Sequence, residues 1–141
     1  MRALVAIDGS ESALRALRYL IDHQNFFSAN SELILANVHL PLPSGRAKAV
    51  LGGDVVARYY QDEAEEVLAP ARKMVTGNSL RVSEQQLVGQ PAAELIAAAM
   101  QGGCDWIVMG THGRGALGNL LMGSVAMRVI ANSPIPVLSV K

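Results

Sequence analysis

The sequence lacks the features of disulfide-rich, zinc-binding, exported and membrane-spanning proteins. Its single cysteine, Cys104, excludes an internal disulfide and a cysteine-rich zinc site and suits a reducing compartment. No apolar run approaches the roughly 20 residues that span a bilayer. The start Met1-Arg2 leads directly into a short apolar stretch, unlike a signal peptide. We therefore expect a cytoplasmic protein with no membrane partner.

An excess of charge of either sign is also missing. Twelve basic and 12 acidic side chains give a formal net charge of +0, which argues against electrostatic binding to nucleic acid or acidic membranes. The charges are unevenly placed, since no acidic residue follows Asp105 whereas Arg114, Arg128 and Lys141 do. An anionic ligand is therefore expected to prefer the C-terminal third.

Apolar stretches rich in strand formers alternate with stretches of helical periodicity in this chain of 141 residues, the length of one domain. Strands are predicted at Arg2–Ile7, Leu33–Leu40, Arg81–Val88, Asp105–Met109 and Ile135–Val140. Helices are predicted from Ala13 to Ile21, after Asp54, from Pro91 to Met100 and from about Ser124 to Ala131. Because most of these strands are almost wholly apolar, the pattern predicts an open parallel sheet with helices on both faces.

The second helix and the segment before it are less regular. Pro41–Gly53 is rich in proline and glycine and is predicted to be an irregular loop. Asp54 can cap the helix that follows, and Pro70 is expected to kink or end that helix. The inward face of this helix is predicted to consist of Val56, Tyr59, Tyr60, Ala64, Val67 and Leu68.

The segment Gly110–Ser124 carries the strongest chemical signal, with five of the 13 glycines between a strand and a helix. Open α/β sheets bind ligands at this place, where backbone N–H groups and a helix N-terminus can cradle an oxyanion. The alternative is a glycine-rich turn without a ligand. Part of the segment, Gly113–Gly118, matches G-x-G-x-x-G, but no acidic residue follows it to hold a ribose. Gly118–Ser124 lacks the lysine of a P-loop.

The spacing Gly110-x2-Gly113-x9-Gly123-Ser124 closely resembles the ATP-binding branch of the universal stress protein family. The resemblance covers the chain from 1 to 141 as one domain and extends to four further segments: Val5–Ser10, Ala36–Val38, Val108–Gly115 and Pro134–Leu138. It implies a Rossmann-like fold, similar to the adenine nucleotide alpha hydrolases, with five parallel strands in the order 3-2-1-4-5. Strands one and four then meet at the topological switch point.

The resemblance also implies a site for ATP, with Mg²⁺ or Mn²⁺ carried by the phosphates. Asp8 and the backbone of Val38 would recognise adenine, and Met109 and Gly110 would line the ribose. The phosphates would bind the backbone N–H groups and the Ser124 hydroxyl in the set Gly113, Gly123, Ser124 and Val125. Arg114 can donate two hydrogen bonds to a phosphate. The chain departs from the family pattern at Ala6 and at Asn37, where proline and histidine are common.

Three functions remain open on these observations. The first is an ATP-binding regulatory protein of the stress response, acting on an unidentified partner. The second is a slow nucleotide phosphohydrolase or phosphotransferase, with Asp8 and His112 as the available bases. The third is a scaffold without a nucleotide. Because the glycine segment offers donors but no nucleophile or metal cluster, a binding protein is favoured over an enzyme.

The last strand, Ile135–Val140, is apolar and would lie at a sheet edge in the order that the resemblance implies. An uncovered edge of this kind invites pairing with another strand. Pro134 and Pro136 lack N–H donors, which confines pairing to the distal half of the strand. We predict a homodimer through this strand, with a monomer as the alternative.

Overall fold

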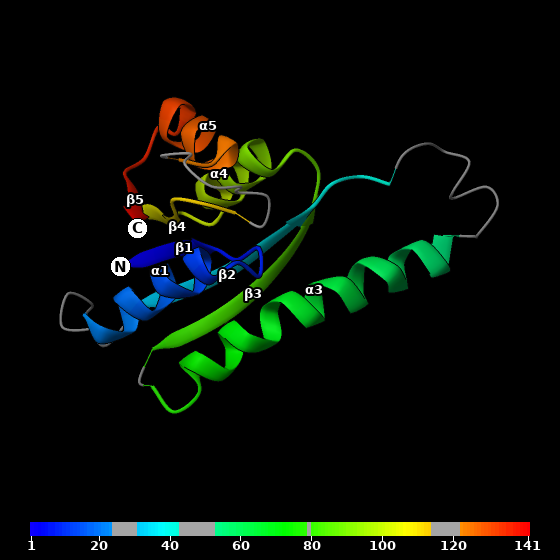
Figure 1. Cartoon of the computed structure of the whole chain (residues 1–141), viewed down its shortest axis with the longest axis horizontal. Coiled ribbons are helices and arrows are strands. Elements are labelled where there is room, and N and C mark those ends of the chain that lie inside the picture. Colours follow the sequence, from blue (N-terminus) through cyan, green and yellow to red (C-terminus); the bar gives the residue numbers. More distant parts are fainter. Residues whose placement is uncertain (24–30, 43–52, 79, 114–121) are drawn as a thin grey trace.

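Five parallel strands form one sheet within the described residues, in the order β3-β2-β1-β4-β5 (Figure 1). The computed structural model describes residues 1–23, 31–42, 53–78, 80–113 and 122–141. The strands are β1 (Arg2–Ala6), β2 (Glu32–His39), β3 (Arg81–Val88), β4 (Trp106–Gly110) and β5 (Val137–Val140). The helices are α1 (Glu11–Asp22), α3 (Gly53–Val75), α4 (Pro91–Gln101) and α5 (Ser124–Asn132). Both the fold class and the strand order are confirmed.

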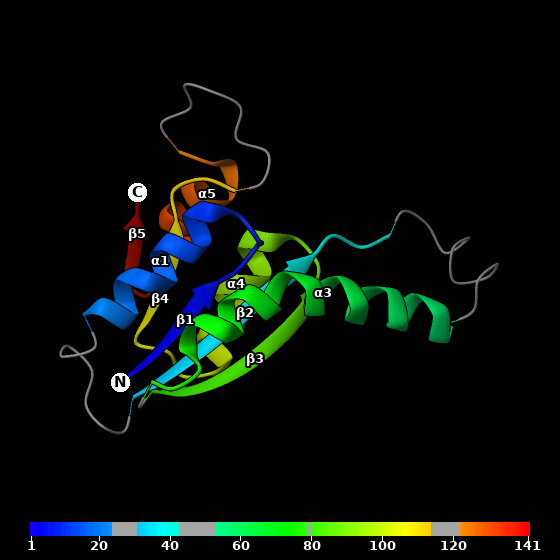
Figure 2. The same cartoon turned by 60° about the horizontal axis from the view of Figure 1, so that its bottom comes forward.

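The helices cover the sheet on both faces, as the apolar strands predicted (Figure 2). On one face, α1 and α3 pack against alternate strand residues such as Val5, Leu35 and Val108. On the other, α4 and α5 pack against Leu4 and Ile107. The central strands are therefore buried on both faces, and the helices leave only the ends of the strands uncovered.

The topological switch point lies between β1 and β4, which pair side by side at the centre of the sheet. Parallel pairing joins β1 to β2 from Arg2 to Ala6 and to β4 from Ala3 to Val5. The chain then leaves the sheet through Gly9, whose φ of 80° favours glycine. The following chain enters α1 on the face opposite to α4 and α5, so the connections that follow β1 and β4 leave the sheet on opposite faces.

The second predicted helix differs from its prediction at three residues. Pro70 lies inside α3, which continues to Val75 and neither ends nor breaks there. Although proline in a helix interior costs about 3 kcal/mol, the buried Leu68 and Val75 on either side of it pack into the core and offset this cost. Asp54 lies in the first turn of the helix, and Tyr59 is 43% exposed, so its predicted inward position is wrong.

A polar network joins the amino-terminal ends of β1, β2 and β3, at the end of the sheet opposite to the carboxyl ends of the strands. The Arg2 guanidinium donates to Glu32 at 3.0 Å, and the Ser83 hydroxyl donates to the same carboxylate at 3.1 Å. The bond from Arg2 holds the pKa of Glu32 below its usual value. Nearby, burial raises the pKa of the Cys104 thiol, which is typical of an inert structural cysteine.

Two element boundaries differ from those predicted from the sequence. In β5 the strand begins at Val137, since Pro134 and Pro136 precede it. Of the predicted loop Pro41–Gly53, residues 43–52 lie outside the described part and Gly53 already belongs to α3. No helix among the described residues is long and apolar enough to cross a membrane.

Candidate functional site

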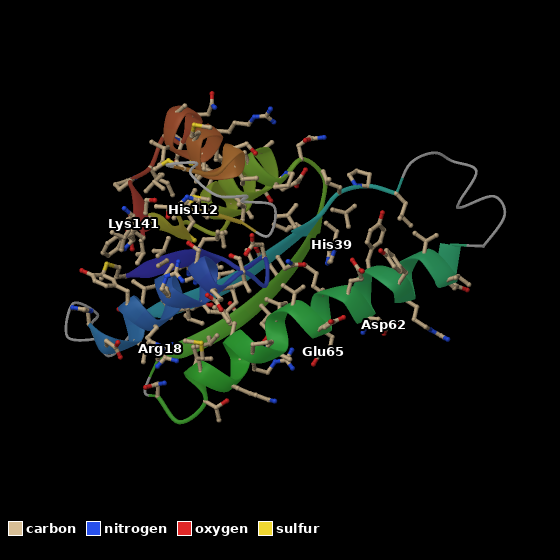
Figure 3. All side chains as sticks on the ribbon, viewed as in Figure 1. Arg18, His39, Asp62, Glu65, His112 and Lys141 are labelled. Carbon is tan, nitrogen blue, oxygen red and sulfur yellow. The ribbon has the colours of Figure 1, made fainter. Side chains whose placement is uncertain are left out.

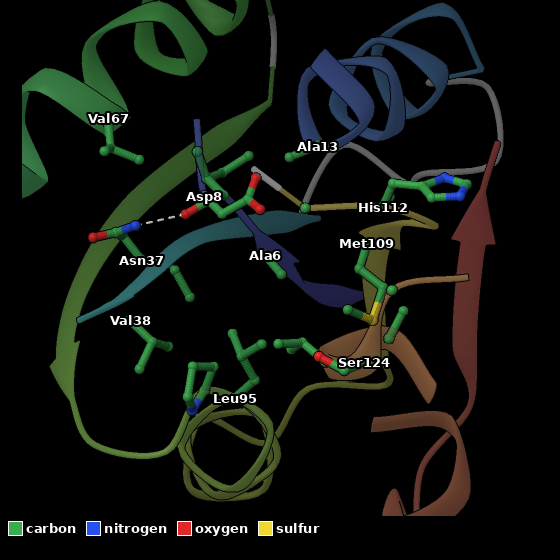
Figure 4. A pocket seen from close by; sticks show the side chains of 18 of the residues that line it. Ala6, Asp8, Ala13, Asn37, Val38, Val67, Leu95, Met109, His112 and Ser124 are labelled. Carbon is green, nitrogen blue, oxygen red and sulfur yellow. Dashed lines mark hydrogen bonds between the residues drawn. The ribbon is translucent and has the colours of Figure 1, made fainter. Parts of the chain in front are cut away.

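A cavity of about 550 Å³ opens where the carboxyl ends of β1, β2 and β4 diverge (Figure 4). This volume lies in the range of small-molecule and cofactor sites. The lining is mostly apolar, with a few polar groups. Its walls come from the end of β1, from β2, from the start of α4, and from β4 and the start of α5.

Asp8 lies at the centre of this cavity because a turn holds its carboxylate there. Its Oδ1 accepts from the backbone N–H of Ser10 at 2.9 Å, and the Ser10 hydroxyl accepts from the Ala13 N–H at 3.1 Å as the N-cap of α1. A Cβ on Gly113 would lie 2.7 Å from Asp8 Oδ2. The end of β1 and the segment after β4 therefore meet at Asp8, as the strand order required.

The two described ends of the glycine segment are joined by a backbone hydrogen bond. The N–H of Gly123 donates to the carbonyl of Thr111 at 2.7 Å. Gly123 is the N-cap of α5, and as glycine it supplies no side-chain acceptor to the first turn. The first N–H groups of α5, from Ser124 onward, therefore face the cavity at the positive end of the helix dipole. This arrangement is suited to an anion.

The wall opposite the glycine segment comes from the end of β2. Val38 lines the cavity on the side of α4, where Pro91 and Leu95 continue the apolar surface. On the side of α3, His39 points toward that helix (Figure 3), and its Nδ1 lies 3.6 Å from Glu63 Oε2. The apolar side chains of Val38, Leu95 and Met109 line this part of the cavity and are suited to contact an aromatic base.

The cavity brings together eight of the nine residues that the sequence singled out. These are Asp8, Val38, Met109, Gly110, Gly113, Gly123, Ser124 and Val125. The ninth, Arg114, lies outside the described residues. Residues more than a hundred positions apart in the sequence thus line one space. Their roles toward a nucleotide remain a prediction, which the proposed function below takes up.

Sequence reasoning missed part of the wall, and His112, one of the two bases that it offered, lines the cavity. The His112 ring points away from Asp8 (Figure 4), and its Nδ1 lies 2.8 Å from the Thr111 hydroxyl. The missed residues are Ala13, Val67, Pro91 and Leu95, which belong to three helices. Their only signal is an apolar position near the sheet end of a helix, which many core residues share.

The described lining contains groups that can recognise a ligand. Asp8 is the only carboxylate among the described lining residues, which include neither lysine nor arginine. No group of three histidine, cysteine or acidic side chains gathers in the described part of the chain to hold a metal ion. Backbone N–H groups, one carboxylate and the Ser124 hydroxyl can bind and orient a polyanion with an aromatic base.

Comparisons with known proteins lead to one family. The model of the universal stress protein family matches residues 1–141. A universal stress protein of Methanocaldococcus jannaschii is 31% identical over 140 residues, which cover 99% of this chain and 81% of that protein. The stress response protein NhaX of Bacillus subtilis is 32% identical, with 99% of this chain and 97% of NhaX covered.

Solved structures have the same fold. A hypothetical protein of M. jannaschii superimposes with a TM-score of 0.82 at 30% identity, covering 99% of this chain and 94% of that one. A universal stress protein in complex with cAMP has a TM-score of 0.69 at 27% identity, covering 100% and 97%. One from Archaeoglobus fulgidus in complex with dAMP has a TM-score of 0.68 at 25% identity, covering 100% and 98%.

Proposed function

This chain belongs to the universal stress protein family, and from that premise we propose that it binds ATP in the cavity at the ends of β1, β2 and β4. Occupancy of the cavity would regulate a partner protein in the cytoplasm during the stress response. Two relatives of the same fold were solved with adenine nucleotides, cAMP and dAMP. The carrying observation is that one cavity gathers an apolar wall, a carboxylate and an uncapped helix N-terminus.

The proposal gives each wall a part of the nucleotide. Adenine lies against the apolar wall beside Val38, with Asp8 accepting a hydrogen bond from the amino group. The ribose lies over Met109 and Gly110. The phosphates receive hydrogen bonds from the N–H groups of Gly113, Ser124 and Val125 and from the Ser124 hydroxyl, close to the positive end of α5. Because the Gly123 N–H already donates to the Thr111 carbonyl, Gly123 contributes by leaving the space that a side chain would fill. Arg114 supplies a counter-charge.

A divalent ion would enter this site with its nucleotide. Mg²⁺ usually keeps several waters and binds through phosphates and one or two carboxylates. In the described cavity only Asp8 has a carboxylate, and its Oδ1 already accepts from Ser10. The ion would therefore be held mainly by the phosphates, where it neutralises their charge.

Calorimetry on nucleotide-stripped protein tests the proposal. Wild type should bind ATP with Mg²⁺. A Cβ on Gly123 would lie 3.3 Å from the Thr111 carbonyl and 3.5 Å from the Gly113 N–H, so Gly123→Val should weaken binding at least about tenfold by filling the phosphate cradle. Gly53→Val is the matched control, since a Cβ there meets nothing within 4 Å. Equal affinity of wild type and Gly123→Val would reject the site.

Slow hydrolysis or phosphoryl transfer is the second candidate, because Asp8 is a carboxylate inside the cavity. A base must reach the water or hydroxyl whose proton it removes. Phosphate release well above a no-protein control, lost in Asp8→Asn while ATP still binds, would favour the enzyme. Release at the level of the control would leave a binding protein.

A further inference from the structure

The carbonyl of Ile7, the first residue after β1, is bonded in an unusual way. The N–H of Ile7 continues the parallel ladder by donating to the Ala36 carbonyl at 2.8 Å. The Ile7 carbonyl instead accepts from a side chain, the amide Nδ2 of Asn37, at 2.8 Å (Figure 4). Asn37 is 4% exposed. A buried side-chain amide therefore occupies the acceptor that the next rung of the ladder would use.

The donor that this rung would have used is the N–H of Val38. Backbone groups of a parallel strand point alternately to its two neighbours. In β2, the N–H of Glu32 and the carbonyl of Ala36 face the β1 side, and the carbonyl of His39 bonds Gly89 on the β3 side. Val38 therefore faces the β1 side, beyond the point where β1 has ended. The turn and loop bonds of the described chain include none to its N–H.

The buried side chain of Asn37 makes only this one hydrogen bond among the described residues. Its Oδ1 is buried and has no partner among the described residues. An unpaired buried acceptor is unfavourable, and an apolar residue of similar shape avoids it. Asn37 is thus better explained by what its amide does to the neighbouring backbone than by stability.

We infer that Asn37 is a positioning residue that keeps the Val38 N–H free for the base, and so makes the cavity select adenine. The Asn37 amide donates to the Ile7 carbonyl on the side from which the Val38 N–H would approach, and the β1–β2 ladder ends before Val38. The free N–H points toward the β1 side, where Ile7 and Asp8 line the cavity together with Val38. This inference rests on the proposed function, and it adds the residue that sets selectivity within that site.

The selectivity follows from the edge of the base. Adenine presents an acceptor, N1, next to its amino group, whereas hypoxanthine presents an N–H at position 1 and a carbonyl at position 6. A backbone N–H meeting N1 and the Asp8 carboxylate meeting the amino group fit adenine at both positions. Hypoxanthine would oppose donor to donor and acceptor to acceptor, which leaves buried groups unpaired.

Calorimetry with ATP and inosine triphosphate, which differ only at this edge, tests the inference. Wild type should bind ATP at least about tenfold more tightly than inosine triphosphate. Asn37→Leu, of similar shape but without a donor, should lose most of this preference, with ATP affinity falling at least about tenfold. Asn132→Ala is the matched control, because that amide also donates to a carbonyl, Arg128, at 2.7 Å, on the exposed end of α5. It should keep the wild-type ratio.

A second measurement separates this inference from the proposed function. Without nucleotide, the Val38 amide hydrogen should exchange rapidly in wild type and slowly in Asn37→Leu, where the Ile7 carbonyl takes it. Slow exchange in wild type, or a wild-type affinity ratio in Asn37→Leu, overturns the inference. If neither triphosphate binds wild type, the proposed function fails, and the exchange of Val38 still decides whether Asn37 frees this N–H.

Discussion

Gly110 and Gly113, three residues apart, are glycines for different physical reasons. A Cβ on Gly110 would lie 2.4 Å from the Ser12 hydroxyl and 2.5 Å from the Ser12 backbone carbon, which belongs to α1. A Cβ on Gly113 would instead meet the end of the Asp8 side chain. The sequence identified both as site residues from their spacing. It could not show that Gly110 also sets how closely α1 packs against β4, because that contact joins residues about a hundred positions apart.

Gly110→Ala should therefore destabilise the whole fold. The new methyl group forces α1 away from β4, and overpacking of this kind costs about 1–3 kcal/mol, occasionally more. Thermal unfolding followed by circular dichroism measures the loss, with Gly53→Ala as the control at an open position. An unchanged melting temperature in Gly110→Ala would contradict the packing described for α1.

Gly113→Ala should act on the ligand and not on the fold. Its methyl group would displace the Asp8 carboxylate, which can rotate, so the melting temperature without nucleotide should stay close to that of wild type. ATP affinity should fall by about tenfold, the effect of one misplaced hydrogen-bonding group. Calorimetry beside thermal unfolding separates the two effects. A large loss of stability with ATP affinity unchanged would be the opposite of this expectation.

At the scale of elements, α3 is attached to the edge strand β3 by one arginine. Arg72 donates to Glu65 of its own helix at 2.6 and 2.8 Å and to Glu84 of β3 at 2.7 and 2.9 Å. The bond from Arg72 lowers the pKa of Glu65, and the two carboxylates raise the pKa of Arg72. This connection holds the end of a helix whose other half extends past the sheet (Figure 1).

Arg72→Ala should lower stability in a manner that depends on pH. Because the folded pKa of Glu65 is lowered, its contribution is present above the unfolded value, 4.5, and is lost as pH falls through the folded value. The variant should melt below wild type at pH 7, and this difference in melting temperature should shrink as pH falls below 4.5. Since all three side chains are partly exposed, the difference at pH 7 should be small and should shrink in high salt. A difference in melting temperature that stays constant with pH would indicate lost packing instead.

Elements were predictable where local chemistry alone determines them. Ser10 caps α1, Pro91 opens α4, and Gly102 with Gly103 ends it, as their residue types indicated. Of the two outcomes predicted for Pro70, an end of the helix is wrong, because a local rule gives way to tertiary packing along α3. The positions of Pro91 and Leu95 in the cavity wall were not predictable, since they depend on how α4 crosses the sheet.

For the whole molecule, β5 is the edge that matters for assembly, and we propose the homodimer predicted from its sequence. β5 pairs with β4 through the carbonyls of Pro136 and Val140, so the backbone of Ser139 faces away from the sheet. Leu138 and Val140 pack partly against the core, so charged residues there would also disturb the fold. The outward N–H of Ser139 is the better point of attack.

Ser139→Pro should turn the dimer into a monomer without unfolding it. Proline removes an outward donor and no bond to β4, and edge strands tolerate it. Light scattering at micromolar concentration should give twice the chain mass of 14.9 kDa for wild type and for Ser139→Ala, which keeps the N–H. Ser139→Pro should give a single chain mass. A wild type that scatters as one chain would sink the proposal.

The central position of β1 in the sheet also has a consequence for folding during synthesis on the ribosome. β1 is made first, yet of its two partners β2 is complete at residue 39 and β4 only at residue 110. At about 5–20 residues per second, one edge of the most buried strand waits roughly 4–14 s for its second partner. During that interval the nascent chain exposes an apolar strand edge, which is the substrate that holding chaperones bind.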